Sequence, residues 1–489
     1  MNYDEFIRFI SYFLDRIFIS YAFLLIFSYT VLSIISGISL NYYLKKNSFV
    51  DYNVILDSPL APSVSVLVPA FNESKNIVDN VESIYTIHYN NFEVIVINDG
   101  STDSTFEDLQ KAFKLEKVDF AVNMEIPAKE VRGIYKSMLS TYSNLVVVDK
   151  ENGGKADALN AGINVSKNAL FMAIDADSIL EPDAVLKLVK PFLERTDRRV
   201  IAAGGVVRIA NSCMVKNGRI TDVKVPKNIL ARMQVLEYTR SFLMGRMAWA
   251  QLDGLIIISG AMGMFDRDVV VQSGGYAHSI GEDMELVVRI RRYMSENREK
   301  YKIEYVPDPL CWTEAPVDVR VFGRQRSRWT RGTIETLTDH SKIFLSPQYG
   351  AMGLLGYPYW FLFEWLAPLV EVLGIIYMII LFFTDNLSLN FILITSLFVY
   401  TFAVFFSTWA ILYEELTFHR YERKMDVFRL WVAALLEPFI LHPISLFYAV
   451  KGNIEYLMGN RSWGKMERKG FLHQKDKTKT QIKKIKSKS

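Results

Sequence analysis

Cysteine is scarce in this chain: Cys213 and Cys311 are the only two among 489 residues. Two cysteines cannot form the disulfide framework of a small secreted domain, and here they make no Cys/His spacing typical of a metal site. We therefore interpret both as buried structural thiols. An excess of one charge is also lacking, because the formal net charge is only +3. No nucleic-acid partner is expected.

Apolar residues are abundant, at 50% of the chain, with a mean hydropathy of +0.13. These values are high for a soluble protein and low for a protein made only of membrane helices. The length also exceeds what one ordinary core accommodates. We therefore expect a soluble domain joined to several membrane spans.

The N-terminal part of the chain predicts a membrane anchor. Residues 18–44 carry no charge before Lys45 and Lys46, and this run is long enough to span a bilayer. Residues 1–17 mix acids and arginines with aromatic residues, which is typical of an interfacial helix. No small-residue cleavage site follows, so an uncleaved anchor is expected rather than a signal peptide.

Two further apolar runs, residues 358–383 and 388–413, predict two more spans. Residues 384–387 between them carry no Lys or Arg, whereas Arg420 and Arg423 follow the second run. By the positive-inside rule, the large central part of the chain faces the cytoplasm, which predicts a multi-pass protein of the cell (inner or plasma) membrane.

The third run, residues 427–457, contains Pro438 and Pro443. It either crosses the membrane and leaves the tail outside, or it bends back; we favour a re-entrant or broken helix with a cytoplasmic tail. The tail, residues 458–489, has ten Lys/Arg and two acids from Lys465 onward, which predicts a disordered segment on anionic membrane lipids.

Three glutamates fall within these apolar runs. Glu364, Glu371 and Glu437 are costly in lipid, so we expect them to face a polar path. The alternative is that one or two of them sit at the interface without a function.

Between residues 57 and 339, short runs of β-branched and apolar residues alternate with helical stretches. Strands are expected at residues 63–70, 90–99, 144–150 and 168–177. This alternation is the signature of a parallel sheet covered on both faces, whose ligands bind at the carboxyl ends of the strands.

The segments after these strands are "PAFNE" (69–73), "NDGSTDST" (98–105), "ENGGKADALNAG" (151–162) and "DADS" (175–178). They bring Asp99, Lys155, Asp175 and Asp177 to one sheet edge. Asp99-Gly100 is also a common turn pair, so Asp99 alone has a structural alternative. Asp175 and Asp177 repel each other unless a cation bridges them, and a hard divalent ion fits.

The second half of this block adds two features. Residues 258–268 predict a strand in which Ser259 and Gly260 let a bulky ligand approach the backbone. Residues 281–292 predict a helix that opens with Glu282 and Asp283. These acids either complement the helix dipole or supply a general base.

Together with "GED" and the Q-R-S-R-W stretch at 325–329, these motifs resemble the family-2 inverting glycosyltransferases. More narrowly, the chain resembles the membrane-embedded processive synthases of cellulose, chitin, hyaluronan and poly-N-acetylglucosamine. The resemblance covers roughly residues 57–345. It implies an α/β GT-A domain with a Rossmann-like mixed sheet, at 52–345, inserted between transmembrane helices, with interfacial and transmembrane helices at 346–457.

The resemblance also implies roles for residues of this sequence. The nucleoside would contact Pro69, Glu73 and Asp99; Lys155 would lie near the diphosphate; and Asp175 and Asp177 would bind it through Mg²⁺ or Mn²⁺, with Asp177 the direct ligand. Ser259 and Gly260 would line the substrate site. The catalytic residues would be Asp283 as base, its neighbour Glu282, and Arg328, while Gln325 and Trp329 would close the site. The remaining arginines, Arg324, Arg326 and Arg331, are expected to meet lipid phosphates.

The implied activity is processive, inverting transfer from a UDP-sugar (N-acetylglucosamine or glucose) to a growing β-linked exopolysaccharide of the kind found in biofilms, with export. Two alternatives stay open: a non-processive glycosyltransferase acting on a polyprenyl phosphate or glycolipid, and a non-catalytic scaffold subunit. The chain leaves no room for the PilZ domain of bacterial cellulose synthase, so we expect such regulation to need an accessory subunit.

Overall fold

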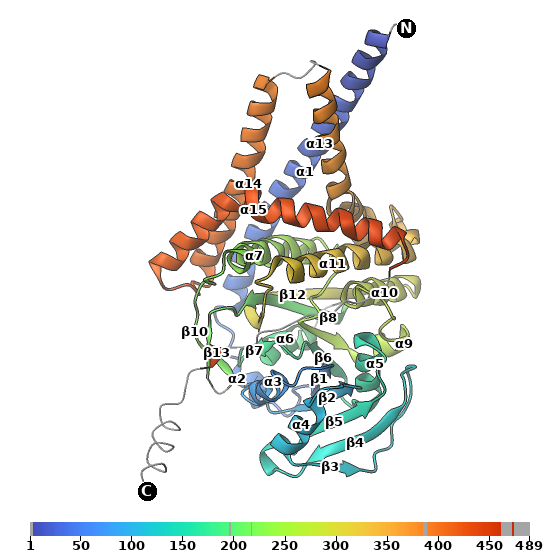
Figure 1. The fold of residues 1–489 in the computed structure, drawn as a ribbon. Helices are drawn as coiled ribbons and strands as arrows, with labels where there is room; N and C mark the ends of the chain where they lie inside the picture. Colours follow the sequence, from blue (N-terminus) through green and yellow to red (C-terminus); the bar gives the residue numbers. More distant parts are fainter. Residues whose placement is uncertain (1–2, 195–196, 217, 385–388, 461–471, 474–489) are drawn as a thin grey trace.

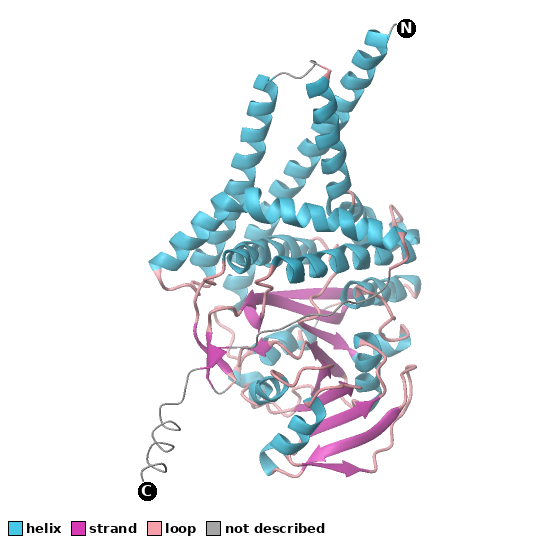
Figure 2. Ribbon diagram, viewed as in Figure 1, coloured by secondary structure: helices cyan, strands magenta, loops and turns pink. Residues whose placement is uncertain are grey.

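A computed structural model describes residues 3–194, 197–216, 218–384, 389–460 and 472–473. An α/β domain lies beneath a group of long helices, three of which, α1, α13 and α14, project away from it (Figure 1). Figure 2 shows that this projecting part is helical and that the main sheet lies within the domain, with helices packed around it.

The main sheet has ten strands in the order β3-β4-β5-β2-β1-β6-β11-β8-β12-β7. Its strands are β1 (Val64–Ala70), β2 (Phe92–Asp99), β3 (Leu115–Val118), β4 (Val131–Ser137), β5 (Leu145–Lys150), β6 (Leu170–Ile174), β7 (Ile179–Leu180), β8 (Arg199–Ile209), β11 (Met262–Asp266) and β12 (Tyr301–Thr313). A smaller sheet joins β9 (Met214–Lys216), β10 (Arg219–Asp222) and β13 (Leu472–His473).

The centre of the sheet is parallel, as the sequence predicted: β5, β2, β1 and β6 run in one direction. Their β-branched side chains are buried, and those of Val64, Val66, Val94 and Val147 are fully inaccessible. Strand β11 is antiparallel to both β6 and β8, which makes the sheet mixed, so the expected mixed sheet is confirmed. Strand β11 begins at Met262, so Ser259 and Gly260 lie in the loop before it rather than within the expected strand.

The helices of the domain flank this sheet. They are α2 (Asn53–Leu56), α3 (Ile77–Ile84), α4 (Thr105–Phe113), α5 (Lys155–Val165), α6 (Ala184–Leu193), α7 (Ile229–Thr239), α8 (Met247–Gln251), α9 (Arg267–Gln272), α10 (Glu282–Glu296) and α11 (Val319–Asp339). The Q-R-S-R-W stretch lies in the middle of α11, whose N-terminus is capped by Asp318, because its side chain accepts hydrogen bonds from Arg320 N and Val321 N.

Three π-helical segments lie between the domain and the projecting helices: Arg240–Arg246, Met352–Gly356 and Trp360–Trp365. The first joins α7 to α8, and the other two flank α12 (Tyr357–Tyr359). Such wide turns are rare and occur frequently at functional sites.

The N-terminal helix α1 is continuous from Tyr3 to Asn47, so the structure joins the interfacial helix and the span that the sequence predicted separately. No proline or glycine separates residues 1–17 from 18–44, and nothing else breaks the helical hydrogen bonding there. Helices α13 (Ala367–Phe383) and α14 (Leu389–Thr417) correspond to the second and third predicted spans. Among the described residues, three helices are long and apolar enough to cross a membrane, namely α1, α14 and the last long helix, Lys424–Leu457. Helix α13 adds a fourth only if it forms one span with the segment Met352–Trp365, from which it is bent by 41°.

The last long helix, α15 (Lys424–Leu457), is continuous through Pro438 and Pro443, so the expected break is absent. It lies across α7 and α11 in Figure 1. Its first turn, its middle and its last turn each contact the domain side: Asp426 accepts from Val225 N, Glu437 pairs with Arg240, and Glu455 pairs with Arg331. A helix crossing a bilayer carries one end about 30 Å from the other along the membrane normal. Although α15 is long and apolar enough to cross a membrane, it therefore runs along the boundary between the domain and the projecting helices. The basic tail after it falls largely outside the described residues.

Candidate active site

A single cavity of about 3250 Å³ extends from the sheet edge to the long helices. All the sequence-predicted site residues line it: Pro69, Glu73, Asp99, Lys155, Asp175, Asp177, Ser259, Gly260, Glu282, Asp283, Gln325, Arg328 and Trp329. We call the part around Asp99, Lys155 and Asp175 the sheet end. We call the part around Glu371, Glu437 and His442 the membrane end.

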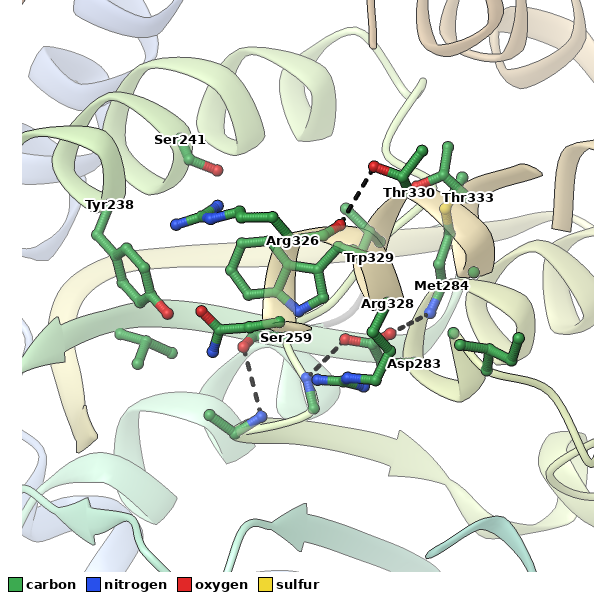
Figure 3. Close-up of a pocket in the computed structure, with 18 of the residues that line it drawn as sticks. Tyr238, Ser241, Ser259, Asp283, Met284, Arg326, Arg328, Trp329, Thr330 and Thr333 are labelled. Atoms are coloured by element: carbon green, nitrogen blue, oxygen red, sulfur yellow. Dashed lines mark hydrogen bonds between the residues drawn. The ribbon is translucent and has the colours of Figure 1, made fainter. Parts of the chain in front are cut away.

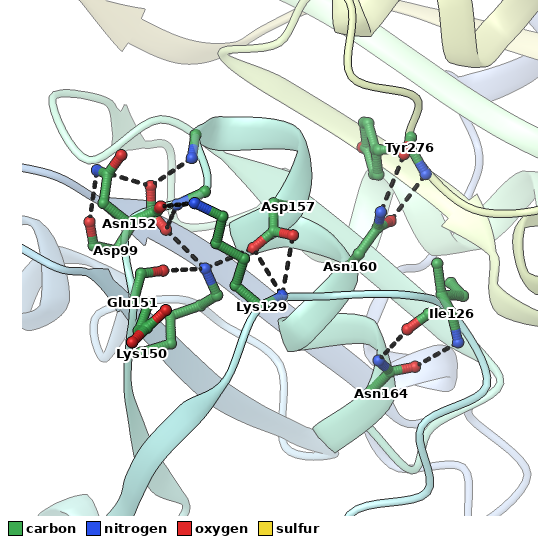
Figure 4. Close-up of polar contacts among 12 residues, drawn as sticks. Asp99, Ile126, Lys129, Lys150, Glu151, Asn152, Asp157, Asn160, Asn164 and Tyr276 are labelled. Carbon is green, nitrogen blue, oxygen red and sulfur yellow. Dashed lines mark hydrogen bonds and ion pairs between the residues drawn. The ribbon is translucent and has the colours of Figure 1, made fainter.

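At the sheet end, Asp99 is held by a dense set of hydrogen bonds (Figure 4). Its Oδ1 accepts from Lys150 Nζ at 2.8 Å and from Gly153 N at 2.9 Å, and its Oδ2 accepts from Gly154 N at 2.8 Å. Lys150 is fully buried and also pairs with Asp157. Asp99 therefore fixes the Gly-Gly turn that leads into α5. The expected contact of Asp99 with a nucleoside remains a prediction, and one of these donors would have to yield for its carboxylate to accept from a base.

The Gly-Gly turn places Lys155 at the start of α5. Gly154 has φ +89°, a conformation that favours glycine. Lys155 Nζ lies 2.7 Å from Asp175 Oδ1 and 2.9 Å from Glu282 Oε1. Burial alone would lower the pKa of Lys155, but Asp175 and Glu282 outweigh it and raise the pKa above its usual value. Lys155 is therefore a charged ammonium between two carboxylates.

The two acids at the start of α10 differ in their surroundings. Glu282 is only 3% exposed, and it holds Lys155. Asp283 is less buried; its Oδ2 accepts from Gly260 N at 3.1 Å and its Oδ1 from Met284 N at 2.9 Å (Figure 3). Gly260 lies close to the same lysine, because a Cβ there would be 2.8 Å from Lys155 Nζ. Asp283 is thus the more accessible of the two carboxylates, whereas Glu282 is paired with Lys155. The role of Asp283 as a base remains a prediction.

The donor set at the end of β6 fits a hard divalent ion. Asp175 and Asp177 offer carboxylate oxygens from one turn, and Glu282 Oε2 nearby in the cavity lining is buried without a hydrogen-bond donor. Within the described residues, no three His, Cys, Asp or Glu side chains gather closely enough to hold a metal by themselves. Such a site suits Mg²⁺ or Mn²⁺ held by one or two carboxylates together with substrate phosphates.

The Q-R-S-R-W stretch reaches the cavity from α11 (Figure 3). Trp329 is 38% exposed, unusually open for a tryptophan in a cavity wall. Gln325 lines the cavity, and its buried Oε1 accepts no hydrogen bond in the structure. Arg328 lines the same wall. These three residues therefore meet Asp283 across one space, as the sequence predicted.

The expectation that the other arginines meet lipid phosphates is wrong for two of the three. Arg326 is buried at 8% exposure and forms a two-pronged pair with Glu237 of α7. Arg331 is buried too, and its Nη1 donates to Asn460 O at 2.8 Å. Only Arg324 is exposed, and it lines the cavity. Because the guanidinium groups of Arg326 and Arg331 are buried and paired within the protein, they cannot contact lipid phosphates.

One segment of the cavity wall was missed from the sequence. Residues 229–251, which form α7, the π-helical segment and α8, contribute Glu237, Arg240, Arg246 and Trp249 to the lining. Charged residues recur within this otherwise apolar stretch, and this pattern could have revealed the segment, because it indicates an interfacial helix that faces a polar space.

The membrane end confirms the expected polar path. Glu364, Glu371 and Glu437 all line the cavity. Glu437 accepts from Arg240 Nη1 at 2.7 Å, which ties α15 to the π-helical segment. Glu371 of α13 lies 2.8 Å from His442 Nε2 of α15. The cavity thus continues from the sheet edge into the space between the long helices.

The match to a known protein family covers most of the domain that carries this site. The family model described as "Glycosyltransferase like family 2" matches residues 61–332. The chain belongs to this family. The expected α/β GT-A-type fold, with helices able to span a membrane on both sides of it, is thereby confirmed.

Relatives of this family member include poly-beta-1,6-N-acetyl-D-glucosamine synthases. The one from Staphylococcus aureus (strain COL) is 29% identical over 278 residues, which are 56% of this chain and 55% of that protein. One from Staphylococcus epidermidis is 26% identical over 275 residues, with the same coverage. The match therefore spans about half the length of these relatives. Among solved structures, the mannosyltransferase PcManGT from Pyrobaculum calidifontis aligns with 89% of this chain and 99% of its own, at 17% identity and a TM-score of 0.48.

Proposed function

We propose that this family-2 glycosyltransferase is a membrane polysaccharide synthase. It would transfer a sugar, N-acetylglucosamine or glucose, from its UDP derivative to a growing β-linked chain and export that chain between its own helices. The observation that carries this proposal is the continuity of the cavity, because Asp99, Asp283, Trp329 and Glu371 all line one space. A transferase acting once on a small acceptor needs no such passage beyond the site of chemistry.

The residues of the site suit inverting transfer. The Asp283 carboxylate accepts the proton of the acceptor hydroxyl while that oxygen attacks the anomeric carbon. The bond from this carbon to the diphosphate breaks on the opposite side, so the configuration inverts and the electron pair leaves with UDP. Lys155 and Arg328 are cations in the same cavity and would stabilise the charge that grows on the leaving diphosphate.

A divalent ion would complete the donor side. Asp177, with Asp175 beside it, would hold Mg²⁺ or Mn²⁺, and the ion would supply neutralisation of diphosphate charge. Pro69, Glu73 and Asp99 would hold the nucleoside at the base of the cavity. Ser259 and Gly260 would line the space for the sugar beside Asp283, because Gly260 N donates to that carboxylate.

The acceptor side would be formed by α11. Trp329 would stack against the terminal sugar of the chain, which is a broad and weakly directional contact that tolerates repeated translocation. Gln325 would donate to or accept from its hydroxyls. The name of the Staphylococcus relatives supports N-acetylglucosamine as the sugar.

The proposed placement puts the domain of residues 52–345 at the cytoplasmic face of the plasma membrane. Helices α1, α13 and α14 would cross the bilayer, and α15 would lie in its interface, because both of its ends contact the domain side. Arg420 and Arg423 before α15 fit the same orientation. Membrane lipids and an accessory subunit of an exopolysaccharide system are the expected partners.

Product analysis tests the proposal. The purified chain in nanodiscs receives Mg²⁺ or Mn²⁺ and a panel of labelled UDP-sugars, and the products are sized. Long polymer from one donor supports the synthase and identifies its sugar. A product that stops after one sugar on a lipid would instead favour the non-processive alternative, and nucleotide binding without UDP release would favour a scaffold.

A further inference from the structure

The arginine in the middle of the Q-R-S-R-W stretch has a geometry that its expected surface role does not explain. Arg326 Cζ lies 4.2 Å from the centroid of the Trp329 ring and 4.5 Å from that of Phe322. The cation therefore covers one face of the indole, while Trp329 remains 38% exposed on the cavity wall (Figure 3). A guanidinium over an aromatic ring is attractive and favours one ring orientation.

The same guanidinium is fixed from the other side. Arg326 Nη2 donates to Glu237 Oε2 at 2.7 Å, and Nη1 donates to Glu237 Oε1. A two-pronged arginine–carboxylate pair defines orientation as well as distance. Glu237 lies on α7 and is 89 positions before Arg326 in the chain. The indole is thus held by a side-chain relay that begins on a different helix.

We infer that Glu237 is a positioning residue for the acceptor: through Arg326 it fixes the ring plane of Trp329 on which the terminal sugar stacks. This inference rests on the proposed acceptor role of Trp329. Without the carboxylate, Arg326 loses the partner that orients its planar fork and can leave the indole. The ring would then sample several rotamers, and each acceptor sugar would have to select the one that stacks.

Helix α11 offers a matched control for this relay. Glu455 of α15 contacts Ser327 and Arg331 on α11, so it also attaches this helix to a neighbour. Unlike Glu237, it does not line the cavity, and neither Ser327 nor Arg331 lies over Trp329. A direct contact of Glu237 with the acceptor is tested separately by the double-mutant cycle below. Glu237→Gln and Glu455→Gln therefore each weaken one attachment of α11, and only the first reaches the indole.

Kinetics with added β-linked oligosaccharide acceptors separate positioning from general loosening. We expect Glu237→Gln to raise the KM for acceptor about five-fold, equivalent to ~1 kcal/mol, and to shorten the polymer, with the KM for UDP-sugar unchanged. Glu455→Gln should leave both KM values near those of the unaltered chain. Equal increases in the two variants, or an increase confined to the donor KM, would overturn the inference.

A double-mutant cycle tests whether Glu237 acts through Trp329. In a Trp329→Ala background, Glu237→Gln should cause no further increase in the acceptor KM. If the two losses simply add, Glu237 acts elsewhere and the relay is wrong.

A structural readout keeps this question separate from the proposed function. With 5-fluorotryptophan incorporated into the full chain, the ¹⁹F resonance of Trp329 is assigned by its loss in Trp329→Phe. We expect Glu237→Gln to shift or broaden this resonance and Glu455→Gln to leave it in place; an unchanged resonance in Glu237→Gln contradicts the relay. Failure of the unaltered chain to elongate any acceptor would refute the proposed synthase without changing this result.

Discussion

The two ends of the cavity hold their side chains in different ways. At the sheet end, Asp99 is bound by Lys150 and by the backbone N–H groups of Gly153 and Gly154, all within one domain. At the membrane end, helices are joined by side-chain pairs such as Arg240–Glu437 and Glu371–His442. The sheet end has side-chain pairs too, such as Lys155–Asp175, but there backbone donors in a fixed turn also hold Asp99. Pairs between side chains alone can exchange partners more easily. Under the proposed function, the difference would suit a nucleotide that always binds in the same place and a polymer that must move.

The largest expected effect comes from the point where the two ends meet. Asp283→Asn should lower the rate of UDP release by about 10³-fold, because the amide cannot accept the acceptor proton. UDP binding, measured by equilibrium dialysis, should persist. Asp268→Asn is the control, since Asp268 is exposed in the first turn of α9 and does not line the cavity. Full turnover by Asp283→Asn would refute the assignment of Asp283 as the general base.

Metal removal should come next in size and should act on the sheet end alone. Excess chelator is expected to lower UDP release about 10²-fold, because an ion on the diphosphate supplies several kcal/mol of charge stabilisation. Added Mg²⁺ or Mn²⁺ should restore it. Asp177→Asn should raise the metal concentration needed for half-maximal rate. An unchanged rate of UDP release in excess chelator would refute the proposed role of the metal ion.

A third prediction tests the rigidity of the sheet end. Lys150→Met leaves Asp99 and Asp157 without their shared buried cation, and breaking a buried pair typically costs about 3–5 kcal/mol. We expect a clear fall in Tm and UDP affinity that is about ten-fold weaker, equivalent to ~1.4 kcal/mol.

The control for this prediction is Lys111→Met, because Lys111 is exposed on α4. If Lys150→Met is no less stable than this control, the hydrogen-bond network around Asp99 is not what holds the sheet end. Polymer length at saturating donor should stay unchanged in both variants.

The same contrast explains what the sequence could predict. Strands β1, β2, β5 and β6 are short runs rich in β-branched and other apolar residues. Asp99 and Asp175 come at the ends of two of these parallel strands, which places both acids at one edge of the sheet. Local patterns also marked the helix that carries Asp283. The arrangement of the sheet end could be predicted from the sequence, because its geometry follows from strands and turns that are continuous in the chain.

The contacts that α11 and α15 make with distant parts of the chain could not be predicted in this way. Arg326 lies in an arginine-rich stretch that predicted a lipid contact, but it is buried against Phe322 and Trp329 and pairs with Glu237, 89 positions away. The two prolines of α15 predicted a break, but contacts at its start, middle and end keep it along the domain. Pairings of this kind depend on the tertiary arrangement, which no local window of sequence contains.

The smallest expected effect tests whether the membrane end serves movement rather than chemistry. Glu371 and His442 line the cavity and are both partly exposed, and partly solvated pairs contribute little, about 0–1 kcal/mol. Glu371→Gln should therefore shorten the polymer by about two- to three-fold while the initial rate of UDP release stays unchanged. Glu422→Gln, on an exposed loop residue outside the cavity lining, is the matched control. A fall in UDP release as large as the fall in length would mean that the two ends are coupled during each transfer, because loosening the passage would then slow the chemistry as well.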